Sequence, residues 1–188
     1  MKTTTVKLYS LSYTELKTYL AASLFIMGNI VFPQLTHLVP NGGITLLPIY
    51  FFTLIGAYKY GWKVGLLTAI LSPVINYLLF GMPMISVLPT ILIKSVLLAL
   101  AAGWAAHYFQ RISIPILVGV VLFYQLIGTL GEWLLTQSFY LAIQDFRIAI
   151  PGMLLQVGGG YLFIKYIYQE DAFILYSAIL QAFNKPQK

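Results

Sequence analysis

Two charged residues lie inside hydrophobic stretches long enough to cross a membrane, and they are the residues most able to do chemistry in this chain. Glu132 falls within residues 114–136, and Lys94 falls within residues 88–109. Burying such a charge at the centre of a membrane helix costs roughly 2.5–3.5 kcal/mol, so a retained charge usually faces a cavity or a partner. Three interpretations stay open. The pair binds the opposite charges of a zwitterionic ligand, one residue binds the ligand while the other tunes it, or the two form a structural ion pair that satisfies itself.

Amide side chains are expected at a similar depth in the membrane. With a rise of about 1.5 Å per helical residue, Asn76, Gln125 and Gln156 fall in the same outer half as Lys94 and Glu132. Gln125 and Glu132 also share one helix face at the 3.6-residue period. The inner halves of these helices hold apolar residues in place of such groups. This pattern predicts a pocket that opens to the outside rather than a continuous pore.

Two further groups of residues could complete such a pocket. His37 and Asn41 lie in the Pro- and Gly-containing loop 33–43, which is either a lid that adds hydrogen bonds to a ligand or an ordinary polar loop. Trp133 could stack on a ligand ring, although aromatic side chains are also common at membrane interfaces. The candidate substrate-binding residues are therefore Lys94, Glu132, Asn76, Gln125, Gln156, Asn41, His37 and Trp133.

The hydrophobic composition of the chain indicates that membrane helices position these residues. The chain of 188 residues is 60% hydrophobic and only 9% charged, which is too few charges to cover a water-soluble domain of this size. It is predicted to be a single all-α membrane domain over residues 1–188, in which Pro33 stops the first helix. Six spans are expected at about 16–32, 44–58, 63–80, 88–109, 114–136 and 148–168, with an amphipathic surface tail at 172–183.

Basic residues predict how the six spans are oriented. An even number of spans puts both termini on one side of the membrane. That side would carry nine of the 11 basic residues, namely Lys2, Lys7, Lys17, Lys59, Lys63, Arg111, Lys165, Lys185 and Lys188. Cytoplasmic loops are enriched in Lys and Arg, so the N- and C-termini are predicted to be cytoplasmic.

Several functional classes lack the residues they need. The chain has no cysteine, so thiolate metal sites and disulfides are excluded. It contains no Gly-x-x-x-x-Gly-Lys-Ser/Thr phosphate-binding loop and no His-Glu-x-x-His or Gly-x-Ser-x-Gly motif. We therefore expect no enzyme activity, no cofactor and no bound metal. The net charge of +6 is better explained by membrane orientation than by nucleic-acid binding.

Small residues at four-residue spacing predict close helix contacts. Ala99 and Gly103 form such a pair in the span 88–109. Spacing of this kind permits contact either within the bundle or with another protein, and spacing alone does not distinguish the two.

Several short motifs occur in an order that resembles the substrate-binding S component of energy-coupling factor (ECF) vitamin transporters. They are the outer loop ending Pro40-Asn41-Gly42-Gly43, the spacing Gly56-x4-Gly61-x3-Gly65, and Pro89-x4-Lys94 followed by LLALAAGWAA. The resemblance covers roughly residues 16–168.

This resemblance implies a six-helix subunit in a bacterial or archaeal cell (inner) membrane that captures a small water-soluble vitamin or related micronutrient from outside. The partners it implies are a membrane coupling protein and two ATPase subunits. The family often carries Ala-x-x-x-Ala in its first helix as a docking surface, whereas here Ala21 and Ala22 are followed four residues later by Phe25 and Ile26. Despite this departure, the coupling protein is expected to dock at Ala21, Ala22, Ala99 and Gly103.

Two alternatives come from other classes. The cell-shape protein MreD is a small polytopic membrane scaffold, but a scaffold has no evident use for buried polar residues at related depth. A small secondary carrier for an amino-acid-like solute is the other alternative, and copurification with ATPases would distinguish it from an ECF-type subunit.

Overall fold

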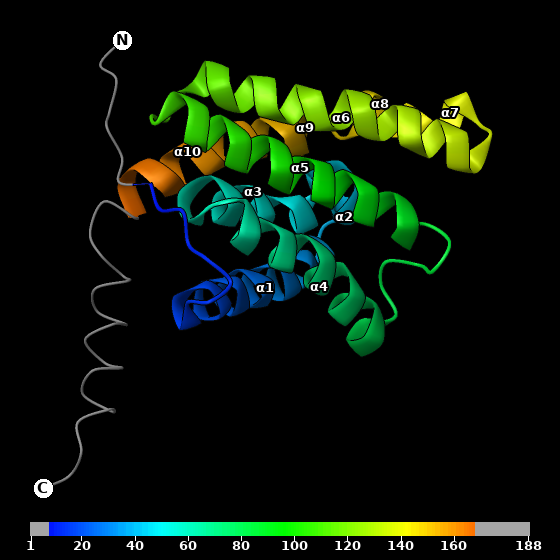
Figure 1. The fold of residues 1–188 in the computed structure, drawn as a ribbon. Helices are drawn as coiled ribbons and strands as arrows, with labels where there is room; N and C mark the ends of the chain where they lie inside the picture. Colours follow the sequence, from blue (N-terminus) through cyan, green and yellow to red (C-terminus); the bar gives the residue numbers. More distant parts are fainter. Residues whose placement is uncertain (1–7, 168–188) are drawn as a thin grey trace, which may run out of the picture.

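The computed structural model describes residues 8–167, and within this range the chain is built from helices (Figure 1). The predicted amphipathic tail at 172–183 lies outside the described residues. Long helices run back and forth along one common direction, so consecutive helices are antiparallel neighbours (Figure 1). Such an arrangement satisfies the backbone N–H and C=O groups within each helix, as a bilayer interior requires.

Five helical segments are long and apolar enough to cross a membrane, by length and composition. They are α1 (Leu16–Thr36), α2 with α3 (Gly42–Leu46 and Pro48–Tyr60), α4 (Trp62–Phe80), α5 (Leu88–Phe109) and α6 (Ile114–Thr136). The first five predicted spans therefore each have a counterpart, and the protein is an all-helical bundle of the multi-pass membrane type.

Proline affects two of these segments in different ways. Leu47 adopts a left-handed conformation with φ of 47°, and Pro48 starts a new helix directly after it, so the second segment is two helices rather than one. Pro33, in contrast, lies inside α1, which continues to Thr36. The prediction that Pro33 stops the first helix was therefore wrong. Because Pro33 has no N–H, the Asn29 carbonyl lacks its usual donor within α1, and a side chain from another helix donates to it instead.

The last part of the described chain follows a less regular path. Two short helices, α7 (Phe139–Ala142) and α8 (Gln144–Ile148), precede α9 (Ile150–Leu154). The chain then continues through the π-helical turns η1 (Leu155–Gly159) and η2 (Phe163–Ile167), with α10 (Gly160–Leu162) between them. This path occupies the region of the predicted sixth span.

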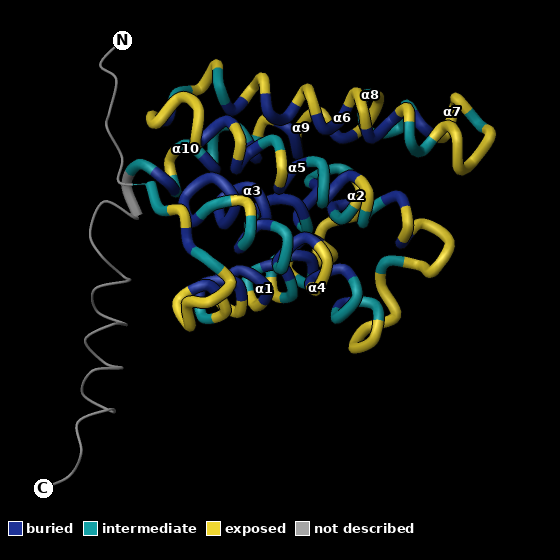
Figure 2. Tube along the Cα trace, viewed as in Figure 1, coloured by how far each residue is buried: buried dark blue, intermediate teal, exposed yellow. Residues whose placement is uncertain are grey.

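The helix α3 is the centre of the bundle (Figure 2). It packs against α1, α4, α5 and the last helical path, and 11 of its 13 residues are buried. Glycine allows these close approaches: a Cβ atom at Gly56 would lie 2.9 Å from the Phe25 ring of α1, and one at Gly65 of α4 would lie 2.4 Å from the Ala57 Cβ of α3. The core therefore depends on small residues at helix crossings.

The outward faces of the helices are apolar, while polar side chains turn inward. On α6, Leu122, Leu126, Leu130 and Leu134 repeat every four residues and are 44–71% exposed. The opposite face of the same helix buries Gln125 and Thr129. An apolar exterior around a partly polar interior suits a lipid environment, where the solvent itself is apolar.

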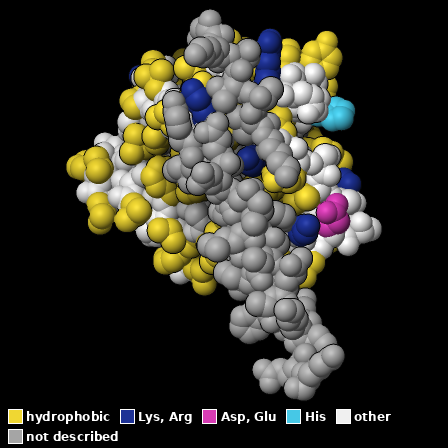
Figure 3. Space-filling model, turned by 90° about the vertical axis from the view of Figure 1, so that its left-hand side faces the viewer, with side chains coloured by type: hydrophobic (Ala, Val, Ile, Leu, Met, Phe, Trp, Pro, Cys, Tyr) yellow, Lys and Arg dark blue, Asp and Glu magenta, His cyan; other side chains and the backbone are white. Residues whose placement is uncertain are grey.

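The bundle has two chemically different ends. At the N-terminal end, defined by residues 8–15, the turn at Gly61 and the loop 110–113, Tyr9 N–H donates to the Lys59 carbonyl and Tyr58 Oη donates to the Arg111 carbonyl. Viewed from this side, Lys and Arg side chains lie around the end (Figure 3). The distal end comprises residues 37–41, 81–87 and 137–149.

Candidate functional site

Lys94, Glu132 and Asp145 form a partly buried ionic triad at the distal end. The Lys94 Nζ lies 2.5 Å from Glu132 Oε2 and 2.9 Å from Asp145 Oδ2. Only 3% of the Lys94 side chain is exposed, against 17% of the Glu132 and 13% of the Asp145 side chain. The structure thus brings together Lys94 and Glu132, which the sequence placed at similar depth, and adds a second carboxylate.

Three separate elements position the triad. Lys94 lies on α5, Glu132 on α6, and Asp145 in the first turn of α8. The Lys94 side chain crosses α6 at Gly128, where an added Cβ would lie only 2.5 Å from Lys94 Cγ. Gly128 therefore provides the space that lets the ammonium group reach a carboxylate one helical turn further along α6.

Buried amide and hydroxyl groups lie next to the triad along α6. Tyr124 Oη donates to Gln156 Oε1 at 2.9 Å, which joins α6 to the last helical path. The rings of Tyr124 and Tyr50 are 5.5 Å apart, which extends the connection to α3. The predicted site residue Gln125 therefore lies about two helical turns from Glu132 on α6, and Gln156 is joined to the same helix through Tyr124.

This neighbourhood has polar atoms whose hydrogen-bonding capacity is unused. The Gln156 Nε2 and the Thr129 Oγ1 are buried and have no hydrogen-bond partner among the described residues, and the buried Gln125 amide makes no hydrogen bond of standard geometry there. Leaving a buried polar group unpaired costs roughly 1–3 kcal/mol, and such groups are rare in folded proteins. Several of them beside one ionic triad are typical of a site that receives its partners from a ligand or from water.

Asn76 makes structural hydrogen bonds and no hydrogen bond to the triad, while its buried Oδ1 has no partner among the described residues. Its Nδ2 donates to the Asn29 carbonyl at 2.8 Å. In an α-helix that carbonyl would accept from the N–H of residue 33, but Pro33 has no N–H. Asn76 supplies the missing donor from α4, and Asn29 in turn donates to Thr53 and Ser72. The group is a structural connection between α1, α3 and α4.

The remaining predicted binding residues surround the distal end without contacting the triad through a hydrogen bond or ion pair in the described chain. Asn41 is exposed and left-handed, with φ of 57°, and immediately precedes α2. His37 is exposed and lies against Gly43, where an added Cβ would be 2.7 Å from its ring. Trp133 is 45% exposed and packs edge-to-face on Phe139, with 5.7 Å between ring centroids.

The four predicted docking residues are used inside the bundle, so their assignment needs correction. Ala21 and Ala22 are 7% and 2% exposed, and Ala99 is 0% exposed. Gly103 is buried against the backbone of Trp62, which would lie 2.7 Å from an added Cβ. These side chains are too enclosed to form a docking surface. The small-residue spacing that the sequence left open is explained by contacts between α5 and α4.

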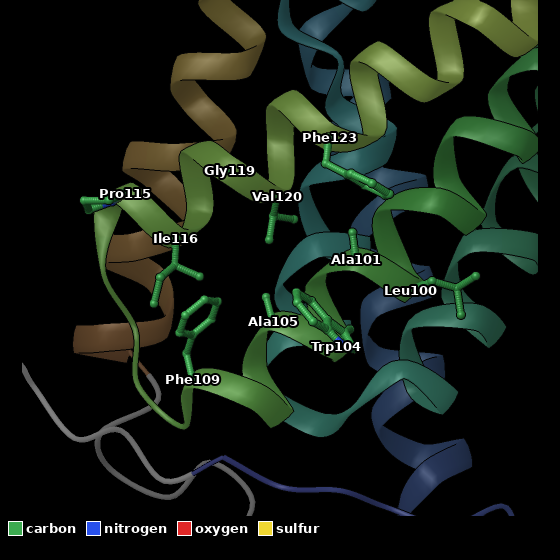
Figure 4. Close-up of a pocket in the computed structure, with 10 residues that line it drawn as sticks. All are labelled: Leu100, Ala101, Trp104, Ala105, Phe109, Pro115, Ile116, Gly119, Val120 and Phe123. Carbon is green, nitrogen blue, oxygen red and sulfur yellow. The ribbon is translucent and has the colours of Figure 1, made fainter.

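A separate hollow lies between α5 and α6 nearer the N-terminal end, with a volume of about 550 Å³ (Figure 4). Trp104, Phe109 and Phe123 are among the side chains that line it (Figure 4). Its wall offers apolar contacts rather than the charges and amides that would hold a polar solute. The ionic triad is therefore the better candidate for a site that binds a water-soluble compound.

Sequence reasoning missed Asp145, Tyr50 and Tyr124. Asp145 lies between the predicted spans 114–136 and 148–168, and no periodic pattern relates a residue between helices to a helix face. The signal that could have identified it is charge: among the described residues the acidic ones are Glu15, Glu132 and Asp145, and two of these three meet Lys94. Residues 8–167 contain no cluster of three or more His, Cys, Asp or Glu that could hold a metal ion.

Comparison of the chain with protein-family models, curated proteins and solved structures finds no match. The class of the protein therefore rests on its own fold and site. Five apolar helices of membrane-spanning length and a partly buried ionic cluster at one end of the bundle indicate a multi-pass membrane protein with an internal polar site.

Proposed function

We propose that this chain is the high-affinity substrate-binding subunit of an ECF-type importer, which captures a small water-soluble vitamin or related micronutrient from the extracellular side. The observation that carries the proposal is the ionic triad of Lys94, Glu132 and Asp145, together with the buried Thr129 Oγ1 and Gln156 Nε2, which have no hydrogen-bond partner among the described residues. A purely structural ion pair needs no unused hydrogen-bonding groups beside it, whereas a ligand site does.

The proposal includes a membrane orientation. The distal end, which holds the triad, faces the outside, and the basic N-terminal end faces the cytoplasm. The helical path from α9 to η2 is the sixth span. Access to the triad is then controlled by α7 and α8, because Asp145 lies on α8 and α8 packs against α2. Movement of these short helices would let a solute enter from outside while the apolar half below stays closed.

The absence of a phosphate-binding loop motif in the sequence leads to a second part of the proposal. Transport requires a membrane coupling protein and two ATPase subunits, and the chain by itself binds substrate without accumulating it. Reconstitution into liposomes tests this part. Accumulation of substrate by the chain alone, without ATP or partners, would favour the secondary carrier over the ECF-type subunit.

The decisive experiment for binding is a thermal-shift screen of the purified protein. The set should cover B vitamins, queuosine precursors, amino acids and metal ions. A compound that binds the folded state raises its stability in proportion to the logarithm of its concentration over Kd. We expect at least one water-soluble compound to raise the melting temperature in a concentration-dependent way. If no compound in the set does so, the scaffold alternative becomes the better explanation.

A further inference from the structure

The triad carries an unbalanced charge. One ammonium group, that of Lys94, faces the carboxylates of Glu132 and Asp145, so the formal charge of the cluster is −1 when all three groups are ionised. The nearest basic residue along the chain, Arg147, instead places its guanidinium 4.1 Å from the centroid of the Tyr140 ring. The other basic residues in the described part of the chain are Lys17, Lys59, Lys63, Arg111 and Lys165, which lie toward the N-terminal end.

An unbalanced carboxylate is unfavourable where the dielectric constant is low. Water and counter-ions compensate a surplus charge most fully at a protein surface, and side chains that are only 13% and 17% exposed are compensated less. Lys94 engages one oxygen of each carboxylate, Oε2 and Oδ2. The charge would be balanced by a second cation positioned between the two acidic groups.

The surroundings of the triad also fit a ligand that has a cationic group and a neutral polar part. Thr129 Oγ1, which has no partner in the described chain, lies one helical turn from Glu132 on the buried face of α6, and the Gln125 amide follows one turn further. The buried rings of Tyr50 and Tyr124 pack on each other with centroids 5.5 Å apart, and Tyr124 is on α6 with Glu132. Aromatic faces attract cations, while amides and hydroxyls bind neutral donors and acceptors.

We propose that the substrate is a cation at neutral pH, with a protonated amine or another positively charged nitrogen that binds between Glu132 and Asp145. This inference rests on the proposed function and narrows its substrate class. It also replaces the sequence-based expectation of a zwitterion, which considered Lys94 and Glu132 without Asp145. A carboxylate ligand would meet a Lys94 whose charge is already shared by two acidic groups.

Three small compounds that share a phenyl ring and differ in charge, here called the charge series, test the inference. Benzylamine, benzyl alcohol and benzoate differ mainly in carrying a positive, no or a negative charge, and their affinities can be compared by thermal shift of the full chain at pH 7. We expect benzylamine to stabilise the protein at concentrations at which benzyl alcohol and benzoate do not. Stabilisation by benzoate equal to or greater than that by benzylamine would overturn the inference.

Variants link this preference to the triad. Asp145→Asn removes the surplus charge and should weaken benzylamine binding by about ten- to a hundredfold while changing benzyl alcohol binding by less than about twofold. The matched control is Glu15→Gln, which removes the same charge at the N-terminal end and should leave both affinities unchanged. Unchanged benzylamine affinity in Asp145→Asn would overturn the inference.

The outcomes separate the substrate class from the function itself. If only neutral or anionic compounds bind, in the charge series and in the vitamin screen, the cationic class is wrong and the binding function stands. If nothing binds in either experiment, the proposed function fails and the inference fails with it. The charge series on the unmodified protein remains decisive even if Asp145→Asn does not fold.

Discussion

Asn76 should stabilise α1 by replacing the hydrogen bond that Pro33 cannot make. Its Nδ2 lies 2.8 Å from the Asn29 carbonyl, and both side chains are almost fully buried. An unpaired buried acceptor costs roughly 1–3 kcal/mol, while hydrogen bonds between membrane helices average about 0.6 kcal/mol with a maximum near 1.7. We therefore expect Asn76→Ala to lower the free energy of unfolding by about 1–2 kcal/mol. Ligand affinity should stay unchanged, because Asn76 does not contact the triad.

A double-mutant cycle with Pro33→Ala isolates this interaction. Alanine at position 33 has an N–H that can donate to the Asn29 carbonyl within α1, so the donor on α4 becomes redundant. In the Pro33→Ala background, Asn76→Ala should destabilise by about 1 kcal/mol less than in the natural chain.

Equilibrium unfolding in mixed micelles measures all four proteins of the cycle. The matched control replaces Ser95, a buried residue whose hydroxyl has no partner in the described chain. Ser95→Ala should be additive with Pro33→Ala. If the effects of Asn76→Ala and Pro33→Ala are additive within about 0.3–0.5 kcal/mol, the explanation of the helix through Pro33 is refuted.

The other predictions concern the triad, the Gln125 amide and the glycine contacts. Glu132→Gln should weaken ligand binding by about ten- to a hundredfold, because it removes one of the two carboxylates between which the cation binds; unchanged affinity would make Glu132 a structural residue only. Gln125→Leu should raise the unfolding free energy of the ligand-free protein by about 1 kcal/mol and lower ligand affinity, because its buried amide makes no hydrogen bond of standard geometry until ligand binds; unchanged affinity would remove it from the site. Gly65→Ala should destabilise by about 1–3 kcal/mol, since its Cβ would lie 2.4 Å from a Cβ of α3, whereas Gly119→Ala, with open space around it, should be neutral or stabilising by up to about 1 kcal/mol. Equal effects at the two glycines, measured by the same unfolding assay, would contradict the packing described for α3.

The parts of the fold that follow from periodicity could be predicted from the sequence. Hydrophobic stretches define the five long segments, and counting along them placed Lys94 and Glu132 at the same depth, where the structure joins them. Asp145 could not be placed in this way, because it lies between helices, where residue spacing carries no fixed direction in space.

Asn76 and the small residues show a different limit. An asparagine side chain can hydrogen-bond either to a ligand or to a backbone carbonyl. Which partner Asn76 takes depends on Pro33, which is distant in sequence and was predicted to end the first helix. Similarly, the spacing of Ala99 and Gly103 predicts close contact without naming the partner, which is α4. Sequence spacing thus predicts that a side chain is buried more readily than it predicts which group it contacts.

Protection of an introduced thiol tests most directly whether the polar cluster beside the triad is the ligand site. The chain has no cysteine, so Thr129→Cys would provide a single thiol beside Glu132, and His107→Cys would provide a control at the opposite end. The measurement is the rate of modification by a small neutral thiol reagent, with and without the compound that gives the largest thermal shift. We predict that the compound slows modification of Thr129→Cys at least about tenfold, as expected for a site more than nine-tenths occupied, and leaves His107→Cys unchanged. Equal rates for Thr129→Cys with and without the compound would contradict the assignment of the site.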